Sequence, residues 1–218
     1  MRHVIIPSLV ALCISACSAS ETRMTQNASP EPAAEQGASG RGLAQPNPQP
    51  RRGYEIVLTI EEAPGPFAVV RGSAQYDVAN RNECGQVNAS TGTVLRISDF
   101  APVALQRVSE TEYRGTVYFD ALLEGDYYGR GTCHWELVHV SAMLQATGAD
   151  GETTFESSLS AAEVASAATG VRYFWKQGYP RSEMDAFPDS GFDNPEKYRP
   201  ELRNDLFKIT MKAQGPLP

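Results

Sequence analysis

The densest group of side chains able to do chemistry lies between residues 120 and 135. These sixteen residues hold three carboxylates, two tyrosines, an arginine, a histidine and a tryptophan. Aromatic and arginine side chains are frequent anchors of protein-binding surfaces. The candidate binding surface therefore consists of Asp120, Glu124, Asp126, Tyr127, Tyr128, Arg130 and Trp135.

The same segment also suits a purely structural role, and both interpretations remain open at this point. The glycines between its polar residues are typical of turns or bulges that lead into a strand. Trp135 would share a strand face with Cys133 and pack against a disulfide, and Arg130 would neutralise Asp126.

Metal binding is not expected here. Asp120, Glu124 and Asp126 offer oxygen ligands for calcium, but their spacing matches no EF-hand loop.

The chain also lacks a recognisable catalytic motif. On a regular strand His134 and His139 point to opposite faces, and only a bulge would bring them to one face. No G-x-S-x-G elbow, H-E-x-x-H motif or Gly-rich phosphate loop is present. We therefore predict neither an enzyme nor a cofactor. A carboxylate-based hydrolase remains an alternative, because the 23 acidic residues from Gly53 onward allow many carboxylate pairs.

The N-terminus has the features of an export signal. Arg2 precedes an apolar run over residues 4–14, which at about 11 residues is too short to span a bilayer. The run closes on small residues before a cysteine, in the motif Ile14-Ser15-Ala16-Cys17.

This motif resembles the lipobox of bacterial lipoprotein precursors. The resemblance covers only the first 17 residues. It implies that residues 1–16 are a signal peptide and that Cys17 is lipidated. Ser18 after the cysteine implies sorting to the outer membrane, facing the periplasm, while the inner membrane and the cell surface remain open. Several acyl chains would hold such a protein essentially permanently.

Two further cysteines, Cys84 and Cys133, lie 49 residues apart. In an oxidising periplasm they are expected to form a disulfide. Closing a loop of that length stabilises a fold by on the order of 4 kcal/mol in the loop-entropy model.

Residues 17–52 are predicted to be the lipidated N-terminus and a disordered tether. The stretch is rich in Pro, Ala, Ser, Gln and Gly, and its large aliphatic side chains are only Met24 and Leu43. Such a composition cannot bury enough apolar surface to offset the entropy of ordering.

The predicted domain, residues 53–218, is acidic. It carries 14 basic and 23 acidic residues, a net charge of −9, against −7 for the whole chain. Nucleic acid and anionic membrane surfaces are poor partners for such a surface, so the membrane is contacted through the lipid anchor alone. A basic protein of the cell envelope is the better partner, and the alternative is that the acidity serves solubility alone. The oligomeric state remains open.

Alternating apolar residues predict an all-β domain. Tyr54, Ile56, Leu58 and Ile60 alternate with more polar positions, as in a half-buried strand. Nine strands separated by turn residues favour an antiparallel β-sandwich, immunoglobulin-like or related, with one or two short helices. The predicted strands cover residues 54–60, 67–76, 93–100, 103–108, 112–119, 132–147, 153–159, 171–176 and 206–212, with helical turns at 160–168.

Residues 177–205 form a long loop with four prolines and four aromatic residues. Loops of this length are often functional. It covers a sheet edge or forms a wall of a ligand groove, and a short helix is expected at Asn194 and Pro195.

Together these features predict a lipid-anchored envelope protein that acts as a non-enzymatic binding module. One concrete version is an immunity or inhibitor lipoprotein directed against a periplasmic toxin. The alternatives are an envelope-assembly or adhesion accessory that pairs a sheet edge with its partner, and an enzyme acting on peptidoglycan or glycans.

Overall fold

Alternating burial in the first strand shows how the sequence builds the sheets. Ile56, Leu58 and Ile60 are buried, and the strand that contains them runs from Gly53 to Glu61. It pairs with antiparallel neighbours on both sides, so it is a central strand of its sheet. The computed structural model describes residues 43–182 and 187–218, all within one compact unit. The predicted signal peptide, Cys17 and most of the predicted tether lie outside these residues.

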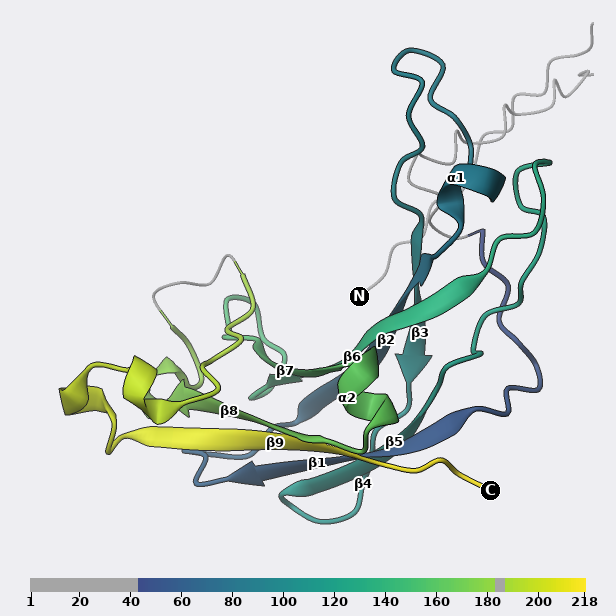
Figure 1. Cartoon of the computed structure of the whole chain (residues 1–218). Coiled ribbons are helices and arrows are strands. Elements are labelled where there is room, and N and C mark those ends of the chain that lie inside the picture. The colour runs from purple at the N-terminus through teal and green to yellow at the C-terminus, as the bar shows by residue number, and fades with distance from the viewer. Residues whose placement is uncertain (1–42, 183–186) are drawn as a thin grey trace, which may run out of the picture. The chain divides into compact units, whose positions relative to one another are not determined.

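The described residues form two antiparallel sheets, which confirms the predicted all-β sandwich (Figure 1). The five-stranded sheet has the order β4-β5-β1-β9-β8 and the four-stranded sheet the order β3-β2-β6-β7. The strands are β1 Gly53–Glu61, β2 Val69–Val78, β3 Ser98–Val103, β4 Gln106–Arg107, β5 Glu112–Tyr118, β6 Trp135–Gln145, β7 Phe155–Ser160, β8 Thr169–Trp175 and β9 Leu206–Gln214.

The helices are short, as predicted. Helix α2, Ala161–Ala165, begins at a capping box in which Ser160 accepts from the backbone N–H of Glu163 and the Glu163 carboxylate accepts from that of Ser160. The other helical elements are α1 Arg81–Cys84 and three 3-10 turns, η1 Lys176–Gly178, η2 Pro195–Lys197 and η3 Pro200–Leu202. Among the described residues no helix is long and apolar enough to cross a membrane.

Strand β6 contains a bulge that changes which residues face the core. Its pairing with β2 shifts register at Val138, and the buried positions change from Trp135 and Leu137 to Val140 and every second residue after it. Since the bulge reverses the alternation, His134 and His139 lie on the same outer side rather than on opposite faces. They are still roughly 15 Å apart along the chain at the usual rise of a strand, so they do not form a pair.

An aromatic cluster fills the space between the sheets. Phe155 from β7 is fully buried, with its ring centroid 5.2 Å from that of Phe207, 5.4 Å from that of Phe174 and 5.8 Å from that of Phe67. Edge-to-face contacts at these distances are favourable beyond the area they bury. The cluster therefore joins both sheets.

The loop at 177–205 covers sheet edges over its described parts, 177–182 and 187–205. Asp189 exchanges backbone hydrogen bonds with the edge strand β7, and Phe192 with Tyr173 on the edge strand β8. One loop therefore protects an edge of each sheet. The helix expected at Asn194 and Pro195 is the 3-10 turn η2, where the Asn194 side chain accepts from a backbone N–H.

Several predicted boundaries differ from the structure: the strand predicted at 103–108, for example, is the two-residue β4. Two of the differences have a clear cause in backbone contacts. Residues 43–52 were assigned to the tether, yet they lie along residues 119–123, with Asn47 and Leu123 in backbone hydrogen bonds of 2.7 and 2.8 Å. The strand predicted at 93–100 begins only at Ser98, because the residues before it belong to a hairpin that extends from 86 to 95. Both segments are held by polar backbone contacts that an apolar pattern does not report.

Candidate functional site

The predicted disulfide joins two segments into one structural unit, which we call the disulfide lobe: residues 80–97 and 120–135. Cys84 and Cys133 are bonded with an S–S distance of 2.06 Å and are fully buried. Figure 1 shows this lobe beyond the ends of β2 and β6 that are nearest to α1.

Asn80 ties the two segments of the lobe together beside the disulfide. Its side-chain oxygen accepts from the His134 backbone N–H at 2.9 Å, and its amide donates to the Thr132 carbonyl at 2.9 Å. Its own carbonyl accepts from the backbone N–H of Glu83 in α1 at 2.9 Å. Asn80 thereby helps to fix where α1 starts through its backbone carbonyl and where β6 is entered through its side chain.

A hairpin of residues 86–95 extends from this base. Asn88 donates its backbone N–H to the Thr93 carbonyl at 2.8 Å, and its side-chain oxygen accepts from the backbone N–H groups of Ser90 and Thr91. Gly92 adopts a φ of +68°, in the left-handed region that favours glycine. Such an Asx turn holds the tip in one conformation.

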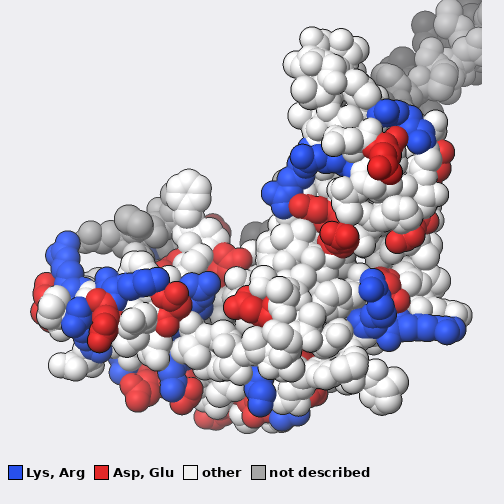
Figure 2. Space-filling model, in the orientation of Figure 1, with Lys and Arg blue, Asp and Glu red and all other residues white. Residues whose placement is uncertain are grey.

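The surface of the hairpin is uncharged and partly apolar. No residue from Gln86 to Leu95 is acidic or basic, and Figure 2 shows the corresponding projection free of charged side chains. Val87 and Leu95 are 42% and 44% exposed. A shallow groove of about 260 Å³ lies on the hairpin and is lined by Gln86, Val87, Asn88, Ala89 and Leu95.

The aromatic residues predicted as binding anchors pack inward instead. Trp135 is 6% exposed, and the Tyr127 ring meets it edge-on with centroids 6.1 Å apart. The Tyr127 hydroxyl donates to the Leu123 carbonyl. Tyr128 is partly buried, and burial, with the nearby charge of Asp99, raises its pKa. These contacts give the rings a packing role in the lobe, in which Trp135 is buried while Tyr127 and Tyr128 stay partly exposed.

The Arg130 side chain supports the base of the hairpin and does not pair with Asp126 as expected. Its guanidinium donates to the carbonyl of Gly85, directly after Cys84. The space there is tight, since a Cβ on Gly85 would lie 2.6 Å from the carbonyl oxygen of Arg81. The Arg130 side chain is therefore bound to Gly85 rather than to Asp126, as the expected neutralisation would require.

Asp126 and Asp120 instead accept backbone hydrogen bonds. Asp126 accepts from the backbone N–H of Arg130 at 2.9 Å, and Asp120 from those of Arg51 and Arg52 at 2.9 and 3.0 Å. Desolvation favours the neutral acids, but the backbone N–H donors outweigh it and hold the pKa of both carboxyl groups below their usual range. These carboxylates therefore shape loops as ionised acceptors.

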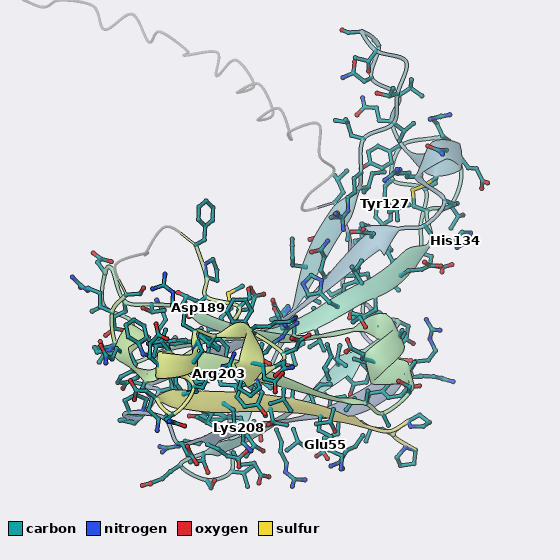
Figure 3. All side chains as sticks on the ribbon, turned by 60° about the vertical axis from the view of Figure 1, so that its left-hand side comes forward. Glu55, Tyr127, His134, Asp189, Arg203 and Lys208 are labelled. Carbon is teal, nitrogen blue, oxygen red and sulfur yellow. A yellow bond between two sulfur atoms is a disulfide. The ribbon has the colours of Figure 1, made fainter. Side chains whose placement is uncertain are left out.

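Glu124 and His134 form the exposed ionisable pair of the lobe. Glu124 Oε2 lies 2.8 Å from His134 Nδ1, and the two side chains are 55% and 53% exposed. Figure 3 shows His134 and Tyr127 on the lobe. Since each predicted carboxylate has a different partner, Asp120, Glu124 and Asp126 do not converge, and no group of three metal-ligating residues occurs in the described part of the chain.

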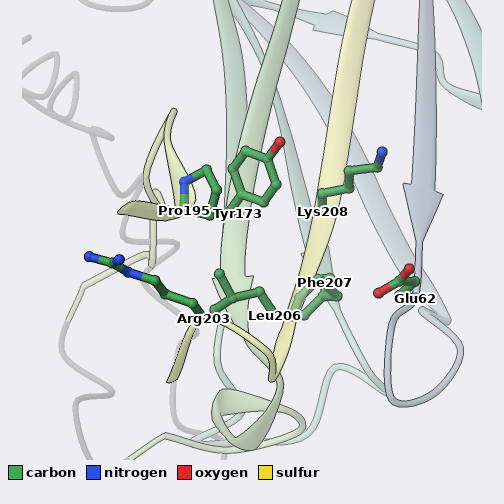
Figure 4. A pocket seen from close by; sticks show the side chains of 7 residues that line it. All are labelled: Glu62, Tyr173, Pro195, Arg203, Leu206, Phe207 and Lys208. Atoms are coloured by element: carbon green, nitrogen blue, oxygen red, sulfur yellow. The ribbon is translucent and has the colours of Figure 1, made fainter. Parts of the chain in front are cut away.

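A second groove, of about 260 Å³, lies beside the covering loop (Figure 4). Pro195 and Arg203 from the loop form one of its walls, so the loop is a groove wall as well as an edge cover. Its cations are already engaged: Arg203 donates to the Tyr198 and Glu196 carbonyls at 3.0 and 2.8 Å, and Lys208 lies 3.2 Å from Glu61.

A third groove, of about 400 Å³, contains the exposed acids Glu62 and Glu110 together with Arg107. Glu62 has a φ of +61°, an uncommon backbone conformation for a residue other than glycine. It also lines the second groove.

The hairpin is the candidate element that the sequence analysis missed. Its signals were present: ten consecutive uncharged residues, with Asn88, Ser90 and Gly92 as turn formers. They were read as a loop and the start of a strand. Comparison with protein-family models, curated proteins and solved structures finds no match to this chain.

Proposed function

We propose that this protein is a lipid-anchored component of the bacterial cell envelope that acts by binding another protein, in the manner of an immunity or inhibitor lipoprotein against a periplasmic toxin. The observation that carries the proposal is the braced, uncharged hairpin of residues 86–95 on the disulfide lobe. A projecting element that is already ordered loses little conformational entropy on association, which favours tight binding.

In this proposal the lobe provides the surface that contacts the partner, and the net charge of the domain attracts the partner from a distance. A net charge of −9 over residues 53–218 steers a basic partner toward the protein at long range. The neutral hairpin then makes the close contact. Long-range attraction by charge, followed by close contact through a neutral surface, suits an inhibitor that must find a secreted basic enzyme quickly.

An envelope-assembly or adhesion role would need an open strand edge that pairs with a strand of the partner, and this alternative has less support than binding through the hairpin. The edges of β7 and β8 are occupied by Asp189 and Phe192, β4 is two residues long, and Pro102 on β3 lacks a backbone donor. A partner strand has little continuous edge to extend.

The anchor is tested by labelling producing cells with palmitate. The wild-type chain is expected to take up label, Cys17→Ala to take up none, and Cys13→Ala to serve as the matched control that still does. Label on Cys17→Ala, or none on the wild type, overturns the anchoring part of the proposal.

The inhibitory function is tested in two steps. The wild-type chain is used to capture proteins from the envelope of producing cells, with an unrelated lipoprotein as control. The gene of a specifically captured protein is then expressed in the periplasm of a heterologous host. Toxicity that the wild-type chain relieves supports the proposal. The absence of any specific partner contradicts it, and a partner that shows no such relieved toxicity contradicts the inhibitor version.

A further inference from the structure

We propose that the 86–95 hairpin enters a recess on the partner protein, and that this recess is lined by neutral polar and aliphatic groups. The inference rests on the proposed function and specifies its contact surface and the chemistry of its partner.

The hairpin differs from the rest of the chain in its distribution of charge. Charged residues make up 21% of the chain, yet none occurs between Glu83 at the base and Arg96, a stretch that includes the whole hairpin. A charge moved from water into a recess without a partner is costly, whereas neutral groups can be buried with modest hydrogen bonding. The hairpin is therefore suited to a recess that offers no counter-charge.

The tip of the hairpin is ordered by its own hydrogen bonds before any partner binds. Besides the Asn88 contacts, the Gly92 backbone N–H donates to the Asn88 carbonyl at 2.8 Å, and the Thr91 and Thr93 hydroxyl groups lie 2.8 Å apart. These contacts are internal to the hairpin, so binding does not have to create them.

The base of the hairpin is held in place by a disulfide and by hydrogen bonds. The disulfide at Cys84, the hydrogen bond from Arg130 to Gly85 and the one from the Val78 backbone N–H to the Ile97 carbonyl, at 3.0 Å, hold both ends of the hairpin. A tip supported at both ends can be pressed into a recess without unfolding.

The surface of the hairpin indicates what the recess contains. Val87 and Leu95 present aliphatic surface in the shallow groove on the hairpin, while Gln86 and Asn88 add neutral polar groups. A partner aliphatic or neutral polar side chain matches this groove. A second copy of the chain is a poor occupant, because two domains of charge −9 repel each other.

The experiment places a photo-crosslinking amino acid at Ser90 in the full-length chain of producing cells. Ser90 is exposed at the tip, and Val108, 59% exposed beside β4, is the matched control position. Ser90 is expected to give one discrete adduct with a different protein, identified by mass spectrometry, and Val108 none.

The identified partner is then purified, and its affinity is measured for the wild type, Ser90→Asp, Leu95→Asp and the control Val108→Asp. Each tip variant is expected to bind about 30-fold or more weakly, the loss typical of a central contact, while circular dichroism stays unchanged and Val108→Asp binds like the wild type. Hydrogen exchange on the partner is expected to map the contact to a concave, neutral site.

The outcomes separate this inference from the proposed function. If the wild-type chain binds a partner but the adduct forms only at Val108, or the tip variants bind normally, the hairpin assignment is overturned while the proposed function stands. An adduct between two copies of the chain, or a contact mapped to an acidic or basic site, also overturns the inference. If no partner binds the wild type at all, the proposed function itself fails.

Discussion

The aromatic core of the sandwich and the disulfide lobe are held together by different kinds of interaction. Phe155 packs against three other phenylalanine rings without a polar contact of its side chain. The lobe is organised by Asn80, Asp126 and Arg130, whose polar groups all bond to backbone atoms. Packing maximises buried area, whereas backbone hydrogen bonds fix the shape of segments that stay exposed. The contrast assigns stability to the core, and our proposal assigns recognition to the lobe.

The largest effect is expected from breaking the core. Phe155→Ala should lower the free energy of unfolding by about 3–5 kcal/mol, through lost burial and the cavity left behind. Urea denaturation measures the loss. Phe187→Ala is the matched control, because Phe187 is 84% exposed and its truncation is expected to change stability by less than about 0.5 kcal/mol. Equal effects of the two variants would contradict the assignment of the core.

Removing the disulfide should affect the disulfide lobe much more than the sheets of the sandwich. The double variant Cys84→Ser, Cys133→Ser is expected to lose up to about 4 kcal/mol for a loop of 49 residues. Hydrogen exchange should accelerate most in residues 80–97 and 120–135, and least in β1 and β9. An equal acceleration in β1 would show that the lobe is not an independent unit.

The sequence predicted what periodicity and local motifs encode. The alternation of Ile56, Leu58 and Ile60 located β1, and the capping pair Ser160 and Glu163 lies where helical turns were expected. Two cysteines in a chain with a predicted export signal were enough to predict the disulfide.

Features that depend on distant partners were not predictable in this way. The bulge at Val138 is set by pairing with β2, and residues 43–52 are ordered by the backbone of residues 119–123 and the carboxylate of Asp120. The inward position of Tyr127 follows from contacts with Leu123 and Trp135 that composition does not reveal. The candidate site therefore moved from the aromatic residues to the hairpin that they help to support.

A smaller effect is expected within the hairpin. Asn88→Ala removes the acceptor for two backbone N–H groups and should destabilise the tip locally by about 1 kcal/mol. Hydrogen exchange at Ser90 and Thr91 should accelerate while the midpoint of global unfolding stays the same. Asn88→Asp keeps an acceptor oxygen and serves as the control. Unchanged exchange in Asn88→Ala would show that the Asx turn does not order the tip.

The smallest effect is expected at Asp120, where residues 43–52 are attached. Its lowered pKa means that the ionised form stabilises the fold above the usual carboxyl range and that this stabilisation is lost as the pH falls through the folded-state pKa. Because the group is largely solvent-accessible, screening limits the contribution to less than about 1 kcal/mol. Asp120→Asn should therefore be slightly less stable than the wild type at pH 6, and the difference should shrink as the pH falls below the usual carboxyl range. A difference independent of pH would contradict this role.

Hydrogen exchange of the full-length chain, with and without its captured partner, tests most directly whether recognition belongs to the disulfide lobe. We expect partner binding to slow exchange in residues 80–97, with the strongest protection between 86 and 95, and to leave the strands of the aromatic core unchanged. Protection confined to the turn between β4 and β5, or to residues 187–205, would contradict the account.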